Sequence, residues 1–82
     1  KFLNFNNVGF VSADILYVKL DGGELLLCYD SSTELKVELG VSATAADKST
    51  IEAALLKIWS QGYTDSVIDV SLSSPVTGVF PQ

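Results

Sequence analysis

The 82-residue sequence has no histidine, and all five of its basic residues are lysines. Histidine is the commonest general base and the commonest metal ligand, so its absence argues against most catalytic schemes and most metal sites. Arginine supplies the bidentate contacts and the stacking that nucleic-acid surfaces favour, so any such surface here must use lysines, backbone groups and aromatic rings. We therefore expect no enzyme, no bound metal and no cofactor.

Cysteine occurs once, at position 28. A single cysteine cannot form an intramolecular disulfide or complete a zinc site, so the composition fits a reducing compartment. Cys28 lies inside an apolar run, and the sequence offers no histidine to activate its thiol. We interpret it as a small hydrophobic core residue rather than as a nucleophile.

The charge balance is acidic, with ten aspartate and glutamate residues and a net charge of −5 at pH 7. This charge keeps a small domain dissolved and opposes the approach of DNA, RNA or anionic lipid at long range. The sequence also lacks a run of about 18 apolar residues, the length that a membrane-spanning helix needs. We expect a soluble protein of the cytoplasm with no membrane partner.

A β-hairpin is predicted near the start of the chain. The segment Ile15–Leu20 is rich in β-branched, aromatic and aliphatic residues, and Gly22 and Gly23 then supply the positive φ angles of a tight two-residue turn. Glu24–Tyr29 forms the returning strand. Both strands are apolar on both faces, so another part of the protein must cover the second face.

A third strand, Glu34–Leu39, follows the polar loop Asp30–Thr33 and completes a meander. Its apolar residues alternate with charged ones, so it is buried on one face only. The parity of the loop decides which residues of the second strand share the face of Leu35 and Val37. A loop with an even number of residues aligns Leu35 and Val37 with Leu26 and Cys28. A loop with an odd number aligns them with Leu25 and Leu27.

Strands are also predicted near both ends of the sequence. Apolar residues between positions 2 and 11 indicate an N-terminal strand that Asn6 and Asn7 bend, and we interpret these asparagines as turn residues rather than as ligand-reading amides. Val67–Leu72 alternates as a strand, and a short strand follows over Val76–Phe80.

One helix is predicted from about Thr50 to Gln61. The spacing of Ser49 and Glu52 matches a capping box, and Gly62 stands where a left-handed C-cap favours glycine. Its apolar side chains span an arc of roughly 200°, wider than the stripe of a helix on one surface, so the helix should touch two surfaces. They are Ile51, Ala54, Leu55, Leu56, Ile58, Trp59 and Tyr63. We interpret Trp59 as packed in the core or in a subunit interface rather than as a platform for a base.

Segments of the meander resemble the first sequence motif of the Sm-like proteins: Val18–Glu24, Cys28–Asp30 and Leu35–Leu39. In that motif a strand ends at an Asp/Gly turn, the next strand ends at an aspartate, and a third begins one short loop later. Asp21-Gly22 and Asp30 occupy the corresponding places here. The whole chain is also similar to small proteins of marine cyanophages, which implies a location in the cytoplasm of an infected bacterium.

The resemblance implies a single α+β domain over residues 1–82 that is mostly β. Its fold would be a small, strongly bent, antiparallel five-stranded Sm-like barrel, with the helix between the third meander strand and the C-terminal strands. Sm-like proteins form rings and bind single-stranded RNA, so the resemblance implies a homo-oligomeric ring that binds single-stranded RNA or DNA. The alternative is a phage structural or protein-interaction module that uses the same oligomeric barrel and binds no nucleic acid.

Strand-end loops of successive subunits would line such a ring and form its nucleic-acid site. The residues that the resemblance assigns to this site are Lys19, Asp30, Ser31, Ser32, Lys36, Ser73 and Ser74. Self-association is also expected from the apolar residues themselves. Strands that are apolar on both faces and a helix with a wide apolar arc carry more hydrophobic surface than one small core can bury.

Overall fold

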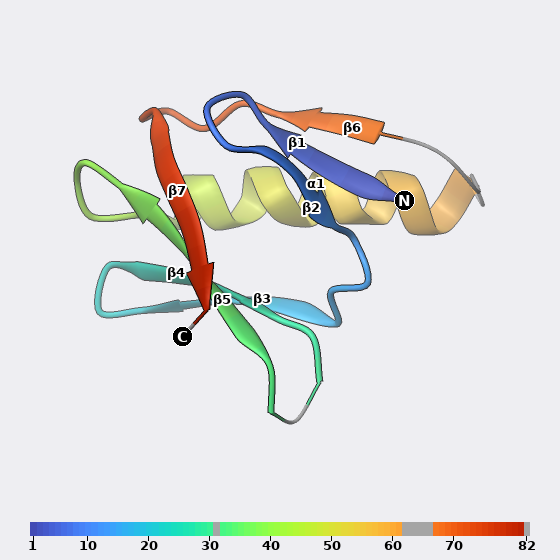
Figure 1. Ribbon diagram of the computed structural model, residues 1–82, viewed down its shortest axis with the longest axis horizontal. Coiled ribbons are helices and arrows are strands. Elements are labelled where there is room, and N and C mark those ends of the chain that lie inside the picture. The colour runs from blue at the N-terminus through green and yellow to red at the C-terminus, as the bar shows by residue number, and fades with distance from the viewer. Residues whose placement is uncertain (31, 62–66, 82) are drawn as a thin grey trace.

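The computed structural model describes residues 1–30, 32–61 and 67–81. These residues form a mostly β fold in which the helix follows the meander and precedes the C-terminal strands, as predicted (Figure 1). The elements are β1 (Phe2–Phe5), β2 (Gly9–Ser12), β3 (Tyr17–Asp21), β4 (Glu24–Cys28), β5 (Glu34–Leu39), α1 (Ala45–Gln61), β6 (Val67–Val70) and β7 (Val76–Pro81).

The described strands are arranged in two sheets. In the first sheet, with the order β2-β1-β6, β1 is antiparallel to β2 and parallel to β6. In the second sheet, with the order β3-β4-β5-β7, every neighbouring pair is antiparallel. The two sheets do not close into a barrel over the described residues, so the five-stranded Sm-like barrel stays a prediction.

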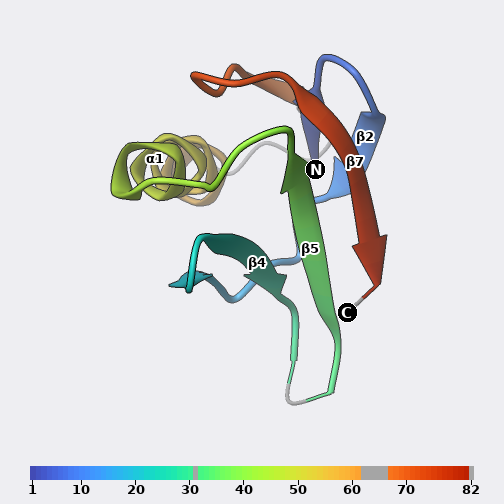
Figure 2. The same cartoon turned by 90° about the vertical axis from the view of Figure 1, so that its left-hand side faces the viewer.

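The helix α1 packs against both sheets, which confirms that it touches two surfaces. It contacts β3 of the second sheet and β6 of the first. Figure 2 shows α1 end-on, on the side of β5 opposite to β7. Among the described residues, no helix has the length and apolar character that crossing a membrane requires.

The predicted hairpin is confirmed. Gly22 and Gly23 have φ angles of +60° and +84° and connect β3 to β4, with Asp21 opposite Glu24. The register of the next pair settles the loop parity, because Leu25 lies opposite Val37 and Leu27 opposite Leu35. The odd loop is therefore the correct alternative.

The N-terminal segment forms two strands rather than a single bent one, because the chain reverses at Asn6 and Asn7. The Val8 backbone N–H donates to the Phe5 carbonyl across this turn at 2.9 Å, and Gly9 follows with a φ of +78°. The prediction that Asn6 and Asn7 form a turn is confirmed. Near the other end, β6 stops at Val70, before the predicted end of its strand.

The predicted helix start was wrong, because α1 begins at Ala45. Thr44 and Asp47 form the capping box: the Thr44 backbone N–H donates to Asp47 Oδ2 at 3.0 Å, and the Asp47 backbone N–H donates to Thr44 Oγ1 at 3.4 Å. Ser49 and Glu52, assigned to the cap, lie inside the helix. The predicted stop at Gly62 and the predicted helix residue Tyr63 lie outside the described residues.

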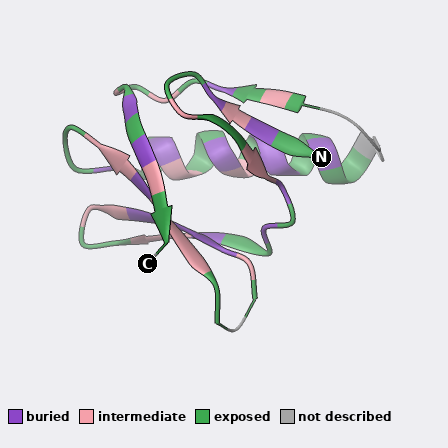
Figure 3. Cartoon of the chain, in the orientation of Figure 1, coloured by how far each residue is buried: buried purple, intermediate pink, exposed green. Residues whose placement is uncertain are grey.

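The core lies between α1 and the two sheets. Figure 3 shows buried and exposed positions alternating along α1. The fully buried large side chains of the core are Leu3, Phe5, Ile15, Leu25, Leu27, Ile51, Leu55 and Ile58. Cys28 is 1% exposed, which confirms its burial. Trp59 is 46% exposed, so the core alternative for it was wrong and the interface alternative stays a prediction.

Candidate functional site

The two lysines assigned to a nucleic-acid site lie on one face of the second sheet. Lys19 on β3 and Lys36 on β5 are both opposite Leu26 on β4. Lys19 Nζ lies 3.8 Å from a carboxylate oxygen of Glu34. Lys36 Nζ lies 2.9 Å from Glu24 and 3.5 Å from Glu38. The structure thus brings the two lysines together, but it places glutamates beside both of them.

These glutamates pair with the lysines and compete with any phosphate group for them. The hydrogen bond with Glu24 is the main cause that raises the pKa of Lys36, and Glu38 adds to it. Glu24, Glu34 and Glu38 outnumber the two lysines, so this face does not carry an excess of positive charge. A phosphate group would have to compete with carboxylates that are already in place.

Asp30 holds the turn between β4 and β5. Its Oδ1 accepts hydrogen bonds from the backbone N–H groups of Ser32 and Thr33, both at 2.9 Å, and from Ser32 Oγ at 3.2 Å. The Ser32 N–H is the main cause that lowers the pKa of the Asp30 carboxyl. These contacts are those of a turn-forming aspartate. Ser31, also assigned to the site, lies outside the described residues.

Ser73 and Ser74 lie in the connection between β6 and β7, far from the Asp30 turn. Figure 1 places this connection at the top of the molecule and the β4–β5 loop at the bottom. Ser73 Oγ donates to Asp47 Oδ1 at 3.0 Å, so its hydroxyl is engaged with the start of α1. The two serines and the described residues of the Asp30 turn therefore do not meet within one chain, and a meeting between subunits stays a prediction.

An apolar groove of about 340 Å³ runs between α1 and the start of β3, and we call it the helix–β3 groove. It is lined by Leu16, Tyr17, Val18, Glu52, Leu55, Leu56 and Trp59. Positions 52, 55, 56 and 59 follow the spacing of one helical stripe. Leu16 and Leu56 are 65% and 60% exposed, so large apolar side chains meet solvent here.

The groove adjoins a free sheet edge. Within residues 1–30, 32–61 and 67–81, β4 is the only strand paired with β3, and β5 is the only strand paired with β7. Each of these edge strands carries an exposed aromatic side chain, Tyr17 on β3 and Phe80 on β7. Edge strands present backbone groups that another strand can pair with.

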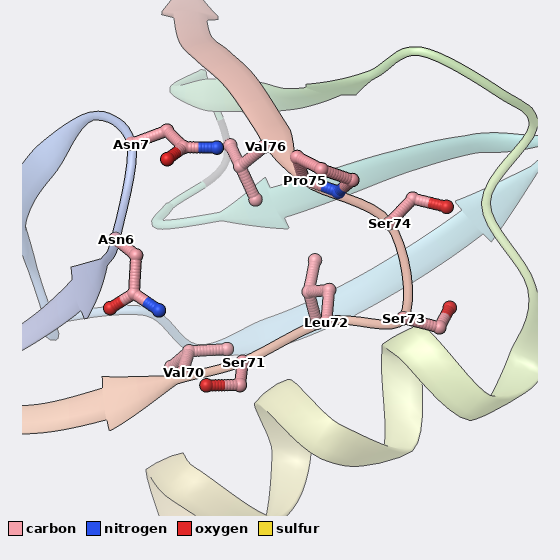
Figure 4. Close-up of a pocket in the computed structure, with 9 residues that line it drawn as sticks. All are labelled: Asn6, Asn7, Val70, Ser71, Leu72, Ser73, Ser74, Pro75 and Val76. Atoms are coloured by element: carbon pink, nitrogen blue, oxygen red, sulfur yellow. The ribbon is translucent and has the colours of Figure 1, made fainter.

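A second pocket of about 290 Å³, lined by both polar and apolar side chains, lies between the β1–β2 turn and the β6–β7 connection (Figure 4). We call it the turn pocket. It is lined by Asn6, Asn7, Val70, Ser71, Leu72, Ser73, Ser74, Pro75 and Val76. In Figure 4 the Asn7 amide points toward Val76, and the Leu72 side chain points into the space between the turn and the connection.

No metal site is evident in the described part of the chain: no three cysteine or carboxylate side chains gather closely enough there to hold an ion. The shifted pKa values of Cys28 and Tyr29 have structural causes. Burial is the main cause that raises the pKa of the Cys28 thiol, and it also raises the pKa of Tyr29, whose hydroxyl donates to the Ser12 carbonyl at 2.7 Å.

Sequence reasoning missed both the helix–β3 groove and the turn pocket. The wide apolar arc of the helix was a signal for the groove, but nothing in the sequence placed Leu56 and Trp59 beside Leu16. The turn pocket depends on the parallel pairing of β1 with β6, which joins residues more than sixty positions apart. The chain matches no protein-family model, no curated protein and no solved structure.

Proposed function

We propose that the chain is a protein-interaction module that self-associates through the helix–β3 groove. The observation that carries this proposal is the exposure of Leu16 and Leu56 side by side with Tyr17 and Trp59. Burying such side chains contributes about 1.5 to 3 kcal/mol each. A contiguous apolar patch of this kind on a small protein is typical of a binding surface.

A second copy of the chain suits this surface because the sheet beside it can be extended. β3 and β7 are the two edge strands of the second sheet. The β3 strand of one copy can therefore pair with the β7 strand of the next. Such a head-to-tail contact repeats from copy to copy and gives a ring when the rotation closes. It would bring Phe80 of one copy toward the groove of its neighbour. The homo-oligomeric ring of the Sm-like resemblance is an assembly of this type.

Sedimentation velocity over a range of protein concentrations tests the proposal. We expect an oligomer that dissociates on dilution, and we expect Leu56→Lys to weaken it by at least about tenfold, or roughly 1.4 kcal/mol, because a charge enters the apolar contact. Val41→Lys is the matched control, since Val41 is 62% exposed and does not line the groove. A monomer at tens of micromolar, or equal effects of the two variants, would contradict the proposal.

Binding of single-stranded nucleic acid, implied by the Sm-like resemblance, is a second proposal, as is the phage origin. Nucleic-acid binding is favoured by the position of Lys19 and Lys36 on one sheet face. The glutamates beside these lysines are the reason that we place it second. With so few cations, binding should be weak and only shallowly dependent on salt.

Titration of labelled single-stranded RNA and DNA at low and moderate salt tests the second proposal. Saturable binding that Lys19→Glu combined with Lys36→Glu abolishes would support it. Lys57→Glu combined with Lys48→Glu is the control, because it makes the same change of net charge on α1. Equal effects of the two double variants would place any binding outside the predicted site.

A further inference from the structure

The turn pocket has the chemistry of a site for an uncharged ligand. Among the described residues, its lining contains asparagine, serine and apolar side chains and no charged side chain. A pocket without a cation offers little to a phosphate or carboxylate, especially in a chain with a net charge of −5. A pocket without a carboxylate offers little to an organic cation.

Four polar side chains of the turn pocket can still form hydrogen bonds with a ligand. Within the described part of the chain, the side-chain amides of Asn6 and Asn7 have no hydrogen-bond partner, and the same holds for the hydroxyl groups of Ser71 and Ser74. Each amide offers one acceptor and two donors, and each hydroxyl offers both functions. The pocket can therefore satisfy a ligand whose neighbouring groups both donate and accept.

The asparagine side chains lie to one side of an apolar patch. Val70 and Val76 are buried beneath the pocket, and Leu72 points into it. Uncharged sugars combine hydroxyl groups at the rim of the ring with apolar C–H groups on its face. That distribution matches amides beside aliphatic side chains. A nucleobase would lack an aromatic partner for stacking, because none of the described lining residues is aromatic.

The walls of the pocket are held in place from both sides. The β1–β2 turn is fixed by the pairing of β1 with β6, where Asn4 Nδ2 donates to Asp69 Oδ1 at 2.8 Å. The β6–β7 connection is fixed to α1 by the hydrogen bond between Ser73 and Asp47. A site whose walls are already ordered requires less ordering on binding.

We infer that the turn pocket binds a single uncharged sugar ring through the side-chain amides of Asn6 and Asn7. Its volume of about 290 Å³ is at the lower limit of small-molecule sites, which span about 300 to 1,000 Å³, and this favours one ring over a longer oligosaccharide. With so few polar contacts and an open site, the dissociation constant should be in the millimolar range. This inference does not depend on self-association, because the pocket is built from one chain.

Chemical-shift titration of the amide-labelled protein tests the inference. The probes are methyl glycosides of glucose, galactose, mannose and N-acetylglucosamine, with adenosine, cytidine, guanosine and uridine as a separate arm. We expect saturable shifts with at least one glycoside, confined to residues 6–7 and 70–76. The absence of saturable shifts with every glycoside at tens of millimolar would overturn the inference. Shifts of the same residues with a nucleoside alone would overturn it as well, in favour of a base.

The variant Asn6→Ala combined with Asn7→Ala then tests the assigned residues. Neither asparagine has a positive φ, so alanine fits the backbone of both positions. We expect the double variant to weaken glycoside binding by about tenfold or more, because it removes both amides. Ser60→Ala, at an exposed position of α1 outside the pocket, should leave the affinity unchanged. Equal affinities of the double variant and the wild type would overturn the assignment, and fully retained backbone shifts elsewhere would show that the variant is folded.

Discussion

Asp47, in the first turn of α1, accepts a hydrogen bond of 3.0 Å from the hydroxyl of Ser73, which lies 26 positions later in the β6–β7 connection. The same carboxylate caps the helix through Thr44, and it is only 2% exposed. A buried carboxylate is tolerated when hydrogen bonds compensate it. Asp47 therefore connects the start of the helix to the segment that leads into the last strand.

Replacing Asp47 with alanine should lower the free energy of unfolding by about 2 to 4 kcal/mol. The change removes the helix cap and leaves the N–H groups of Thr44 and Ser73 without their acceptor. Urea unfolding followed by circular dichroism measures the loss. Glu52→Ala is the control, since its exposed ion pair with Lys48 should contribute no more than about 0.5 kcal/mol. A loss for Asp47→Ala as small as that of the control would contradict this account of the cap.

The stability of the protein should also fall in acid through Asp47. Folding lowers the pKa of its carboxyl below the ordinary value of 3.8, chiefly because the Thr44 backbone N–H donates to it, and Ser73 adds to this effect. The ionised form is thus favoured by folding, and its contribution is complete above the unfolded pKa. The contribution is lost as the pH falls below 3.8 and through the lower folded pKa.

The acid dependence of Asp47→Asn distinguishes this carboxyl from the others. Below pH 3.8, the free energy of unfolding of this variant should fall less steeply than that of the wild type. Some slope should remain, because Asp30 also has a lowered pKa and is present in both proteins. Urea unfolding at a series of pH values provides the comparison, and parallel slopes would show that Asp47 does not titrate differently on folding.

Gly23 should be far less tolerant of substitution than Gly40. An added Cβ at Gly23 would meet the Ser42 side chain at 3.1 Å, and the residue has a φ of +84°. Gly23→Ala should therefore cost about 1 to 2 kcal/mol. Gly40 has open space around it and no positive φ, so Gly40→Ala should change stability by less than about 1 kcal/mol. Thermal unfolding of both variants measures the difference, and equal melting temperatures would contradict it.

Cys28 should react slowly with thiol reagents in the folded protein. Its side chain is buried, its Sγ lies 3.4 Å from Glu34, and burial raises the pKa of the thiol, so little reactive thiolate is present near neutral pH. Reaction with a chromogenic disulfide should become fast in denaturant. A Ser32→Cys variant that also carries Cys28→Ala is the reference for an exposed thiol at an exposed position. Equally fast reaction of native Cys28 would contradict its burial.

The meander could be predicted because its signals are local. Gly22 and Gly23 determine the turn that joins β3 to β4, and alternation along Glu34–Leu39 determines β5. The helix start was missed because Thr44 with Asp47 and Ser49 with Glu52 have the same spacing, and the glutamate is the more typical partner in a capping box. Propensity alone could not choose between two such pairs.

The candidate sites could be predicted only in part because they depend on contacts between distant residues. The sequence placed Lys19 and Lys36 on the first and third strands of a meander, but it could not show that glutamates pair with both of them. It identified Asn6, Asn7, Ser73 and Ser74 separately. Their meeting in one pocket requires β1 to lie beside β6, and no local signal specifies that pairing.

The parallel pairing of β1 with β6 has a consequence for the order in which the molecule assembles. β1 is the middle strand of the first sheet, yet its parallel partner β6 begins at Val67, after the meander and the helix. Closing so long a loop is slow compared with forming hairpins. On the ribosome the meander can therefore fold while β1 and β2 form an isolated hairpin with an exposed apolar face. These two strands precede the meander in the chain but are among the last elements to be protected from misassembly and proteolysis.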